Sequence, residues 1–250
     1  MPWPLQQQPV ALITGAGSGI GREVAFELAG RGYAVCLVGR TESKLNQTAE
    51  RVSSNAEHAL QPLVLAVDIA LPESASVIID RISAWAGRLD ALINNAGIAP
   101  LYPIAATSFE TLQEVFLINT IGPARLIAEA WPLLIAGEFA DRQPSACVVN
   151  VSTIGTIDPF PGFFAYAASK SALESFTRSI VVEGAEHNVR AFSVAPGAVE
   201  TPLLRSLFDE AMLPRELAMS PGHVANVIAA CVMGERDQDS GRVITMTQSS

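Results

Sequence analysis

Short apolar runs alternate with amphipathic segments along the chain. Runs rich in valine, isoleucine and leucine are typical of strands buried on both faces; they cover residues 10–14, 34–38, 63–67, 91–93, 146–151, 189–194 and 243–246. Apolar residues at helical spacing fill the stretches between them, at residues 23–31, 43–53, 74–86, 110–134, the segment around Tyr166, and 223–233. This alternation predicts an α/β fold: a doubly wound, mostly parallel, seven-stranded sheet with helices on both faces.

Nothing in the sequence divides the chain into separate domains. It contains no repeat and no low-complexity linker, and the polar stretch 136–145 is too short to be a domain boundary. The chain has 250 residues, of which 49% are hydrophobic and 16% charged, so it can bury a sizeable core. We therefore expect a single domain over residues 1–250.

Charge and composition narrow the classes of partner. The formal net charge of −9 argues against nucleic acid and anionic membranes, because both select basic surfaces. The three histidines and three cysteines are scattered without metal-ligand spacing, so we expect no metal site and buried, reduced thiols. The start of the chain lacks a basic segment followed by an apolar one, and no apolar tract could span a bilayer, which favours a cytoplasmic location.

A glycine-rich segment, Thr14-Gly-Ala-Gly-Ser-Gly-Ile-Gly21, joins the first expected strand to the first expected helix. Glycines let a ligand approach the backbone, and the unpaired N–H groups at a helix start favour a pyrophosphate. The phosphate loop of nucleoside triphosphatases does not fit, because Arg22 follows the last glycine, and the strict G-x-G-x-x-G pattern fails at Ile20. The pattern Thr-Gly-x-x-x-Gly-x-Gly does fit, and it favours dinucleotide binding over a tight turn without a ligand.

Tyr166 and Lys170 lie four residues apart in a segment with helical spacing, so their side chains share one face of a helix. A nearby cation favours the phenolate and lowers the pKa of a tyrosine, which would let Tyr166 exchange a proton with an alcohol oxygen near neutral pH. Taken alone, the pair could equally be a snorkelling surface pair. The rest of the sequence has to distinguish the two interpretations.

Several motifs, taken in order, resemble those of the short-chain dehydrogenases/reductases. Beside the glycine segment they are Asp68, Asn94-Asn-Ala-Gly97, Asn119-Thr-Ile-Gly122, Val151-Ser-Thr153, Tyr166 with Lys170, and Pro196-Gly-Ala-Val-Glu-Thr201. The resemblance covers residues 10–246. It implies a Rossmann-type fold and an NAD(P)-dependent oxidoreductase that interconverts a carbonyl compound and its alcohol by hydride transfer.

The resemblance also implies a set of residues around the cofactor. They are Gly15, Ala16, Gly17, Ser18, Gly19, Ile20, Gly21, Arg40, Asp68, Ile69, Asn95, Ala96, Gly97, Tyr166, Lys170, Pro196, Gly197, Val199 and Thr201. For Asp68 a cap or turn former is the other interpretation, and for residues 196–201 an ordinary turn.

The end of the second expected strand bears on the choice of cofactor. An acid at the position of Gly39 would bind the adenosine ribose of NAD, whereas glycine followed by Arg40 leaves room and a partner for a 2′-phosphate. We therefore predict NADP rather than NAD, with a solvated loop arginine as the alternative role of Arg40. Ser18 stands where some NADP-dependent relatives carry a second basic residue.

The same resemblance implies the chemical roles. Tyr166 is the acid/base, Lys170 lowers its pKa and binds the nicotinamide ribose, and Asn119 holds a water that links Lys170 to solvent. A hydroxyl that polarises the carbonyl is expected thirteen residues before the tyrosine, where Thr153 stands in place of the usual serine. Threonine keeps the O–H donor with fewer rotamers. Ser152 is the alternative if the loop shifts by one residue, so the sequence favours Thr153 and leaves Ser152 open.

The substrate is expected between the loop after Ser152 and a short lid at about residues 200–220. Both segments are apolar: the first contributes Ile154, Ile157, Phe160, Phe163 and Phe164, and the second contributes residues 202–208, which include the cation Arg205. They suit an apolar ketone, an aldehyde or a 3-oxoacyl group. Packing of the lid onto the body of the protein would produce the same pattern.

The resemblance also implies a homodimer or homotetramer, although the tail at residues 241–250 lacks the Asp-Gly-Gly ending of many relatives. Two other functions compete with the carbonyl–alcohol reaction: a catalytically silent dinucleotide-binding sensor or structural subunit, and an epimerase or dehydratase that uses the same tyrosine and lysine. The intact Tyr166, Lys170 and Asn119 argue against the first. The second needs an added substrate domain, for which little chain remains.

Overall fold

The computed structural model describes residues 8–55, 60–136 and 145–248, and the polar stretch 136–145 and the first residues of the chain lie largely outside this part. Its centre is one sheet in which every neighbouring pair of strands is parallel, in the order β3-β2-β1-β4-β5-β6-β7. The strands are β1 (Val10–Thr14), β2 (Ala34–Gly39), β3 (Leu63–Ala66), β4 (Ala91–Asn94), β5 (Cys147–Val151), β6 (Arg190–Pro196) and β7 (Val243–Met246). The prediction of a doubly wound sheet is confirmed.

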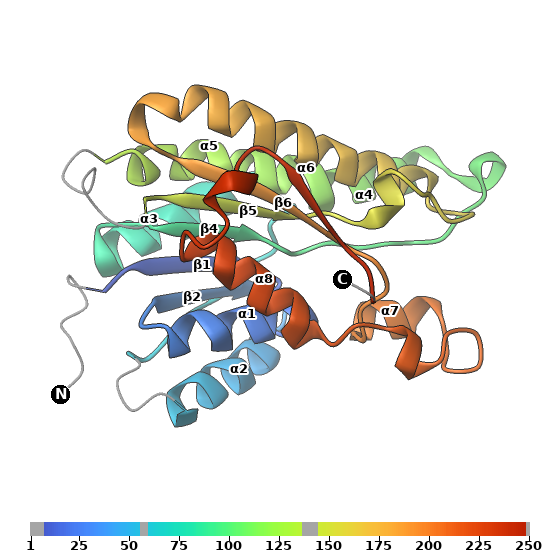
Figure 1. Ribbon diagram of the computed structural model, residues 1–250, viewed down its shortest axis with the longest axis horizontal. Coiled ribbons are helices and arrows are strands. Elements are labelled where there is room, and N and C mark those ends of the chain that lie inside the picture. The colour runs from blue at the N-terminus through green and yellow to red at the C-terminus, as the bar shows by residue number, and fades with distance from the viewer. Residues whose placement is uncertain (1–7, 56–59, 137–144, 249–250) are drawn as a thin grey trace.

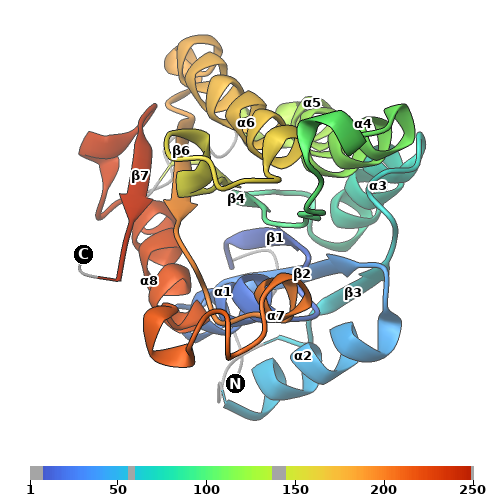
Figure 2. The same ribbon diagram turned by 90° about the vertical axis from the view of Figure 1, so that its right-hand side faces the viewer.

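Helices cover both faces of this sheet, as Figures 1 and 2 show. The helices are α1 (Gly19–Gly30), α2 (Glu42–Asn55), α3 (Ser74–Ala86), α4 (Phe109–Phe116), α5 (Gly122–Leu134), α6 (Phe164–Glu183), α7 (Pro202–Leu207) and α8 (Pro221–Val232). In Figure 2, α1, α2 and α8 lie below the sheet and α3, α5 and α6 above it. None of the helices in the described ranges combines the length and the apolar character that crossing a membrane requires.

The strand order reverses direction next to β1. The chain first adds β2 and β3 on one side of β1, and then returns to place β4 on the other side. The loops that follow β1 and β4 therefore diverge at the carboxyl ends of these strands and leave a crevice between them. In open parallel sheets this crevice is where ligands bind.

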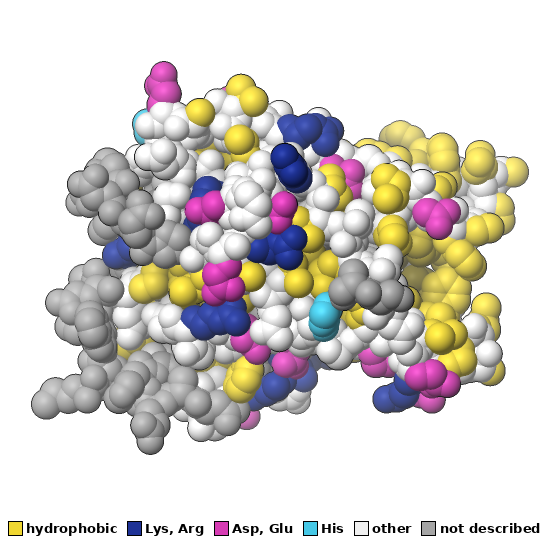
Figure 3. Space-filling model, viewed as in Figure 1, with side chains coloured by type: hydrophobic (Ala, Val, Ile, Leu, Met, Phe, Trp, Pro, Cys, Tyr) yellow, Lys and Arg dark blue, Asp and Glu magenta, His cyan; other side chains and the backbone are white. Residues whose placement is uncertain are grey.

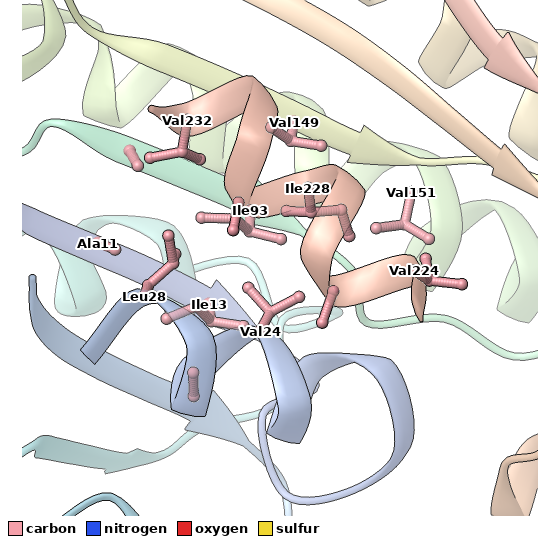
Figure 4. Packing of buried hydrophobic residues seen from close by; sticks show 14 of the residues in the cluster. Ala11, Ile13, Val24, Leu28, Ile93, Val149, Val151, Val224, Ile228 and Val232 are labelled. Carbon is pink, nitrogen blue, oxygen red and sulfur yellow. The ribbon is translucent and has the colours of Figure 1, made fainter. Parts of the chain in front are cut away.

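Aliphatic side chains from α1 and α8 pack together over the inner strands. Figure 4 shows them converging on β1, β4 and β5: Ala11, Ile13, Val24, Leu28, Ile93, Val149, Val151, Val224, Ile228 and Val232. Burial of each larger side chain contributes about 1.5–3 kcal/mol relative to an exposed one. A second cluster, which includes Leu12, Ile78 and Leu126, fills the opposite face. The three cysteines are buried free thiols, as expected.

The predicted strands agree with the observed ones to within two residues at each end. The long helix predicted over residues 110–134 is confirmed as an unbroken helical stretch, but a π-helical segment, Leu117–Ile121, lies within it between α4 and α5. A side chain at Gly122 would come within 2.8 Å of the carbonyl oxygen of Ile69, so the chain needs glycine here. Pro123 follows and cannot donate a backbone hydrogen bond, which favours a change in the helical hydrogen-bond pattern at this point.

A ladder of buried polar side chains links three strands to α6. The Asn94 amide donates to Asn150 Oδ1 at 2.9 Å, and the Asn150 amide donates to Thr177 Oγ1, also at 2.9 Å. Thr177 in turn shares a hydrogen bond of 2.8 Å with Ser193. All four residues are buried. The ladder fixes α6 against the carboxyl-terminal half of the sheet, next to the crevice.

Removal of the centre of this ladder should destabilise the fold. In Asn150→Leu, the Asn94 amide and the Thr177 hydroxyl each lose a buried partner, so we expect the free energy of unfolding to fall by about 2–4 kcal/mol. Urea unfolding followed by tryptophan fluorescence measures this change. The control Ser175→Ala removes an exposed hydroxyl from α6 and should change the free energy by less than about 0.5 kcal/mol. Equal effects of the two substitutions would contradict the importance of the ladder.

Candidate active site

One pocket of about 660 Å³ lies at the carboxyl ends of the strands, and the loops after β1 to β6 contribute to its wall. Most residues predicted for the cofactor and for catalysis line it: Gly15, Gly17, Ser18, Gly19, Ile20, Arg40, Asp68, Ile69, Asn95, Ala96, Gly97, Ser152, Thr153, Tyr166, Lys170, Pro196, Gly197, Val199 and Thr201. Ala16, Gly21 and Asn119 do not reach the pocket wall and are buried behind it. Residues from seven separate segments thus converge on one cavity.

The glycine segment has the backbone of a phosphate cradle. Gly15 and Gly19 have φ values of 66° and 52°, which disfavour other residues, and α1 begins at Gly19 with its first N–H groups unpaired. A side chain at Gly15 would lie 2.7 Å from the amide nitrogen of Asn95, and one at Gly21 would overlap the carbonyl oxygen of Gly15. The pocket wall is therefore bare backbone at a helix N-terminus, an arrangement that fits the pyrophosphate of a dinucleotide.

Thr14 and Asn95 hold this cradle against the loop after β4. The Thr14 hydroxyl accepts hydrogen bonds of 3.0 Å from the backbone N–H groups of both Asn95 and Ala96, and the Asn95 amide donates to the Thr14 carbonyl at 2.9 Å. The Thr14 hydroxyl and the Asn95 amide nitrogen thus brace the two loops. Asn95 also lines the pocket.

Two cations lie at the end of the pocket formed by β2. Arg40 and Lys44 line the pocket beside Gly39, and neither has a hydrogen-bond or ion-pair partner for its charged group among the described residues. Sequence reasoning missed Lys44, which lies four residues after Arg40 in the first turn of α2. The Cβ atom of Lys44 would lie 3.0 Å from a side chain at Gly17, which shows how closely α2 approaches the glycine segment.

Tyr166 and Thr153 meet at the middle of the pocket. Their side chains are hydrogen-bonded, and this bond acts to lower the pKa of Tyr166. Burial has the larger, opposite effect and raises the pKa of Tyr166 to about 12. The Thr153 hydroxyl also accepts a hydrogen bond of 3.2 Å from the Gly155 N–H. In this bond Thr153 Oγ1 is the acceptor, so its own proton stays available for an acceptor such as the phenol oxygen.

Lys170 lies one helical turn after Tyr166 and is only 3% exposed. Its ammonium group donates a hydrogen bond of 2.8 Å to the carbonyl oxygen of Val151, at the end of β5. Burial lowers the pKa of Lys170 to about 8. The Tyr166 phenol and the Lys170 ammonium group thus both line the pocket and are both buried, and a polar partner bound beside Lys170 would stabilise the charged lysine.

Asn119 lies in the π-helical segment, behind the pocket wall. Its amide oxygen accepts from the Ile98 N–H at 2.9 Å, and its amide nitrogen donates to the Ile98 carbonyl and to Ser169 Oγ. A side chain at Gly97 would lie 3.1 Å from Asn119 Oδ1 and 3.2 Å from Lys170 Nζ. The space above Gly97 is thus bordered by both polar groups, an arrangement compatible with a bridging water.

Ser152 has a different environment from Thr153. Its hydroxyl donates a hydrogen bond of 2.7 Å to Glu174 Oε1, on the side of the loop that faces α6. Thr156 Oγ1 lies 2.8 Å from the same carboxylate oxygen. The structure thus brings Thr153 to Tyr166 and engages Ser152 elsewhere, and Glu174 is a residue that the sequence motifs did not single out.

The other half of the pocket is apolar and aromatic. Rings of Phe208, Phe160, Phe163 and Tyr166 follow one another with centroid separations of 5.4, 5.8 and 5.0 Å, and link the segment after β6 to the tyrosine. Other apolar residues that line this half are Ile154, Leu203, Leu204, Leu207, Met212 and Leu213. In Figure 3 hydrophobic side chains gather at the end of the molecule where α4 and α7 lie in Figure 1.

Two predictions for this half need correction. Ile157 and Phe164 are not part of the pocket wall and are largely exposed. Arg205 does not face a ligand, because it forms an ion pair with Glu200 and donates a hydrogen bond of 2.7 Å to the Leu213 carbonyl. It therefore holds residues 200–213 together. Asp158, which the motifs did not single out, lines the pocket and is exposed.

Comparison with known proteins agrees with this geometry. Residues 9–211 match the family model described as short chain dehydrogenase. An uncharacterized oxidoreductase of Staphylococcus saprophyticus is 31% identical over 197 residues, which is 79% of this chain and 81% of the relative. A cyclopentanol dehydrogenase of Comamonas sp. is 32% identical over 212 residues, which is 83% of this chain and 80% of the relative.

Solved structures agree with the same assignment. Levodione reductase superposes with a TM-score of 0.86 at 25% identity, and the match covers 96% of each chain. A 3-ketoacyl-(acyl-carrier-protein) reductase from Brucella melitensis, solved with NADH, superposes with a TM-score of 0.85 at 24% identity and the same coverage, a likeness of fold alone. The resemblance inferred from the motifs is confirmed: the chain belongs to the short-chain dehydrogenase family, whose members are oxidoreductases that use NAD(P)(H).

Proposed function

We propose that the protein is an NADP-preferring oxidoreductase that interconverts an apolar ketone or aldehyde and its alcohol. The observation that carries this proposal is the hydrogen-bonded pair of Thr153 and Tyr166, which lies where the cradle half of the pocket meets the aromatic half. Two hydroxyl groups directed to one point can both donate to a single carbonyl oxygen. A 3-oxoacyl group meets the same requirement.

The cofactor would bind along the half of the pocket that contains the glycine segment. The backbone at residues 15–19 and the start of α1 suit the pyrophosphate, residues 95–97 line the adenosine side, and residues 196–201 line the nicotinamide side. A nicotinamide dinucleotide bound there supplies or accepts the hydride. Lys170 would donate to the hydroxyls of the nicotinamide ribose, which would stabilise its charged form and raise its pKa above the value of about 8 set by burial.

In the reduction, Thr153 would donate a hydrogen bond to the carbonyl oxygen and Tyr166 would transfer its phenolic proton to the same atom. The Tyr166 oxygen would then regain a proton from solvent through Lys170 and the space above Gly97. In the oxidation, the phenolate would accept the proton of the alcohol. In its charged form Lys170 would favour the phenolate, and it would so oppose the effect of burial on the pKa of Tyr166.

Removal of the phenolic proton should abolish turnover without loss of cofactor binding. For Tyr166→Phe we expect kcat to fall by at least about 10²-fold, and the Kd of NADPH to change less than about threefold. The parent should reduce carbonyl compounds at a rate that falls at alkaline pH, where Tyr166 loses its proton, and oxidise alcohols at a rate that rises with pH. The absorbance of the reduced cofactor, followed with a panel of carbonyl compounds, measures both directions.

Two outcomes of that assay would contradict the proposal. Binding of NADPH without oxidation by any carbonyl compound would point to a sensor or structural subunit. Isomerisation of a substrate with no net change in the cofactor would point to an epimerase.

The preference for NADP rests on Arg40 and Lys44. Gly39 carries no carboxylate, so nothing at the end of β2 repels a phosphate, and the two cations beside it lack partners of their own among the described residues. Arginine suits a phosphate through its planar fork of donors, and lysine adds a second charge. Together they form a local positive region on a protein with net charge −9.

Substitution of these cations should weaken NADP binding selectively. We expect Arg40→Ala to raise the Kd of NADP by about tenfold or more, Lys44→Ala by about two- to fivefold, and neither to change the Kd of NAD by more than twofold. The reciprocal variant Gly39→Asp should favour NAD, and its side chain would only press on the flexible end of Leu45 at 3.3 Å. Titration of each variant with NADP or NAD, followed by tryptophan fluorescence, measures these Kd values without turnover. Equal losses for NADP and NAD in Arg40→Ala would contradict the assignment.

The preference of the protein for neutral over anionic substrates should depend on Asp158. Among the described residues of the loop after β5 and of residues 196–213, Asp158 is the charged side chain that lines the pocket. It is exposed and has no ion-pair partner among them. A carboxylate in this position repels substrates that carry a negative charge away from the reacting carbonyl.

We therefore expect the protein to prefer a neutral ketone to a matched ketone that carries a carboxylate on its tail. In Asp158→Asn the ratio of kcat/KM values for the two should narrow by about three- to tenfold, and the narrowing should shrink at high salt. The value for the neutral ketone alone should stay within about twofold. An unchanged ratio of kcat/KM values would show that Asp158 does not contribute to substrate selection.

A further inference from the structure

The proposed function gives no role to the carboxylate of Glu174. It lies on α6, one turn after Lys170 and two turns after Tyr166, so all three side chains share one face of the helix. Glu174 does not line the pocket. It is half-buried, and one of its oxygens, Oε1, receives hydrogen bonds from Ser152 at 2.7 Å and from Thr156 at 2.8 Å.

These two donors flank Thr153, and the turn between them is held together by its own hydrogen bonds. The Thr156 N–H donates to the Thr153 carbonyl at 3.2 Å, and Thr156 Oγ1, at 3.0 Å, shares its proton between that carbonyl and Glu174. The Gly155 N–H donates to the Thr153 hydroxyl. The orientation of that hydroxyl therefore depends on the turn from 152 to 156, and Glu174 joins both ends of this turn to α6.

The packing around the turn leaves little room for another arrangement. A side chain at Gly155 would lie 3.2 Å from the Phe163 ring, and that ring packs edge-on against Tyr166 with a centroid separation of 5.0 Å. The turn, the ring and the phenol form one packed unit. Hydrogen bonds to a carboxylate are short and strong, so the Glu174 contacts are suited to fix the register of this unit on α6.

We propose that Glu174 is a positioning residue, which holds the turn from Ser152 to Thr156 on the catalytic helix so that the Thr153 hydroxyl is directed to Tyr166. The inference rests on the proposed carbonyl–alcohol function for its consequence in catalysis. It explains why Ser152 does not replace Thr153: the Ser152 hydroxyl is occupied by Glu174. Both hydrogen bonds end on the single oxygen Oε1 of Glu174, so an uncharged side chain with an oxygen in the same position keeps most of the effect.

Two substitutions separate the acceptor from the charge. Glu174→Ala removes the acceptor for both hydroxyls, whereas Glu174→Gln keeps a side-chain oxygen at the same length. We expect kcat to fall by about 10-fold or more in Glu174→Ala and to stay within about threefold in Glu174→Gln, with the Kd of NADPH within twofold in both. The control Glu183→Ala removes an exposed carboxylate at the end of the same helix and should leave kcat unchanged.

A double substitution shows whether Glu174 acts through Thr153. Thr153→Ala removes the hydroxyl that Glu174 is proposed to position, so adding Glu174→Ala to it should cost less than about threefold more in kcat. If Glu174→Ala does not fold, Ser152→Ala with Thr156→Val removes the donors and keeps the carboxylate, and it should reproduce the loss of kcat. Multiplied losses in the double variant, or a Glu174→Gln variant as poor as Glu174→Ala, would overturn the proposal.

Amide hydrogen exchange tests the positioning itself, without turnover. In Glu174→Ala the N–H groups of Gly155 and Thr156 should exchange at least about tenfold faster than in the parent, while β1 and α1 stay unchanged; Glu174→Gln should resemble the parent. Unchanged exchange at these two groups would overturn the proposal. A parent that turns over no carbonyl compound would instead refute the proposed function, and the exchange result would still decide the role of Glu174.

Discussion

The site depends on one buried hydrogen bond, from the Lys170 ammonium group to the carbonyl oxygen of Val151. It joins the helix that carries Tyr166 to the end of β5, one of the strand ends at which the pocket lies. A buried ammonium group with a neutral acceptor is costly, and its lowered pKa expresses that cost. A dinucleotide whose ribose hydroxyls accepted hydrogen bonds from Lys170 would reduce the free-energy cost of burying this charge. The site as described would therefore bind such a partner favourably.

Many polar groups near the pocket serve to brace it. Thr14 and Asn95 join the glycine segment to the loop after β4, and Arg205 with Glu200 holds the segment after β6. Ser152 is bound to α6 through Glu174. With these groups engaged internally, few are left to face a ligand. Thr153, Tyr166 and Lys170 belong to that small set and would form the reactive part of the proposed site.

The pocket changes character along its length. Bare backbone, a helix N-terminus and the cations at the end of β2 suit a polyanionic cofactor, whereas the opposite half is built from aromatic and aliphatic side chains. The phenol of Tyr166 belongs to both halves, because its ring packs on Phe163 and its hydroxyl meets Thr153. The same apolar surroundings that suit an uncharged substrate raise the pKa of the phenol, whereas the Thr153 hydroxyl acts to lower it.

The sequence by itself determined the α/β class, the strands to within two residues and the family, because hydrophobic periodicity and motif spacing are local properties of the chain. Only the tertiary structure decided the π-helical segment between α4 and α5, beside which Gly122 approaches Ile69. It also decided the approach of Lys44 to the glycine segment. It also decided that Thr153 meets Tyr166 while Ser152 meets Glu174. The acceptor of a hydroxyl depends on distance and direction in space, and the position of a residue along the chain gives neither quantity.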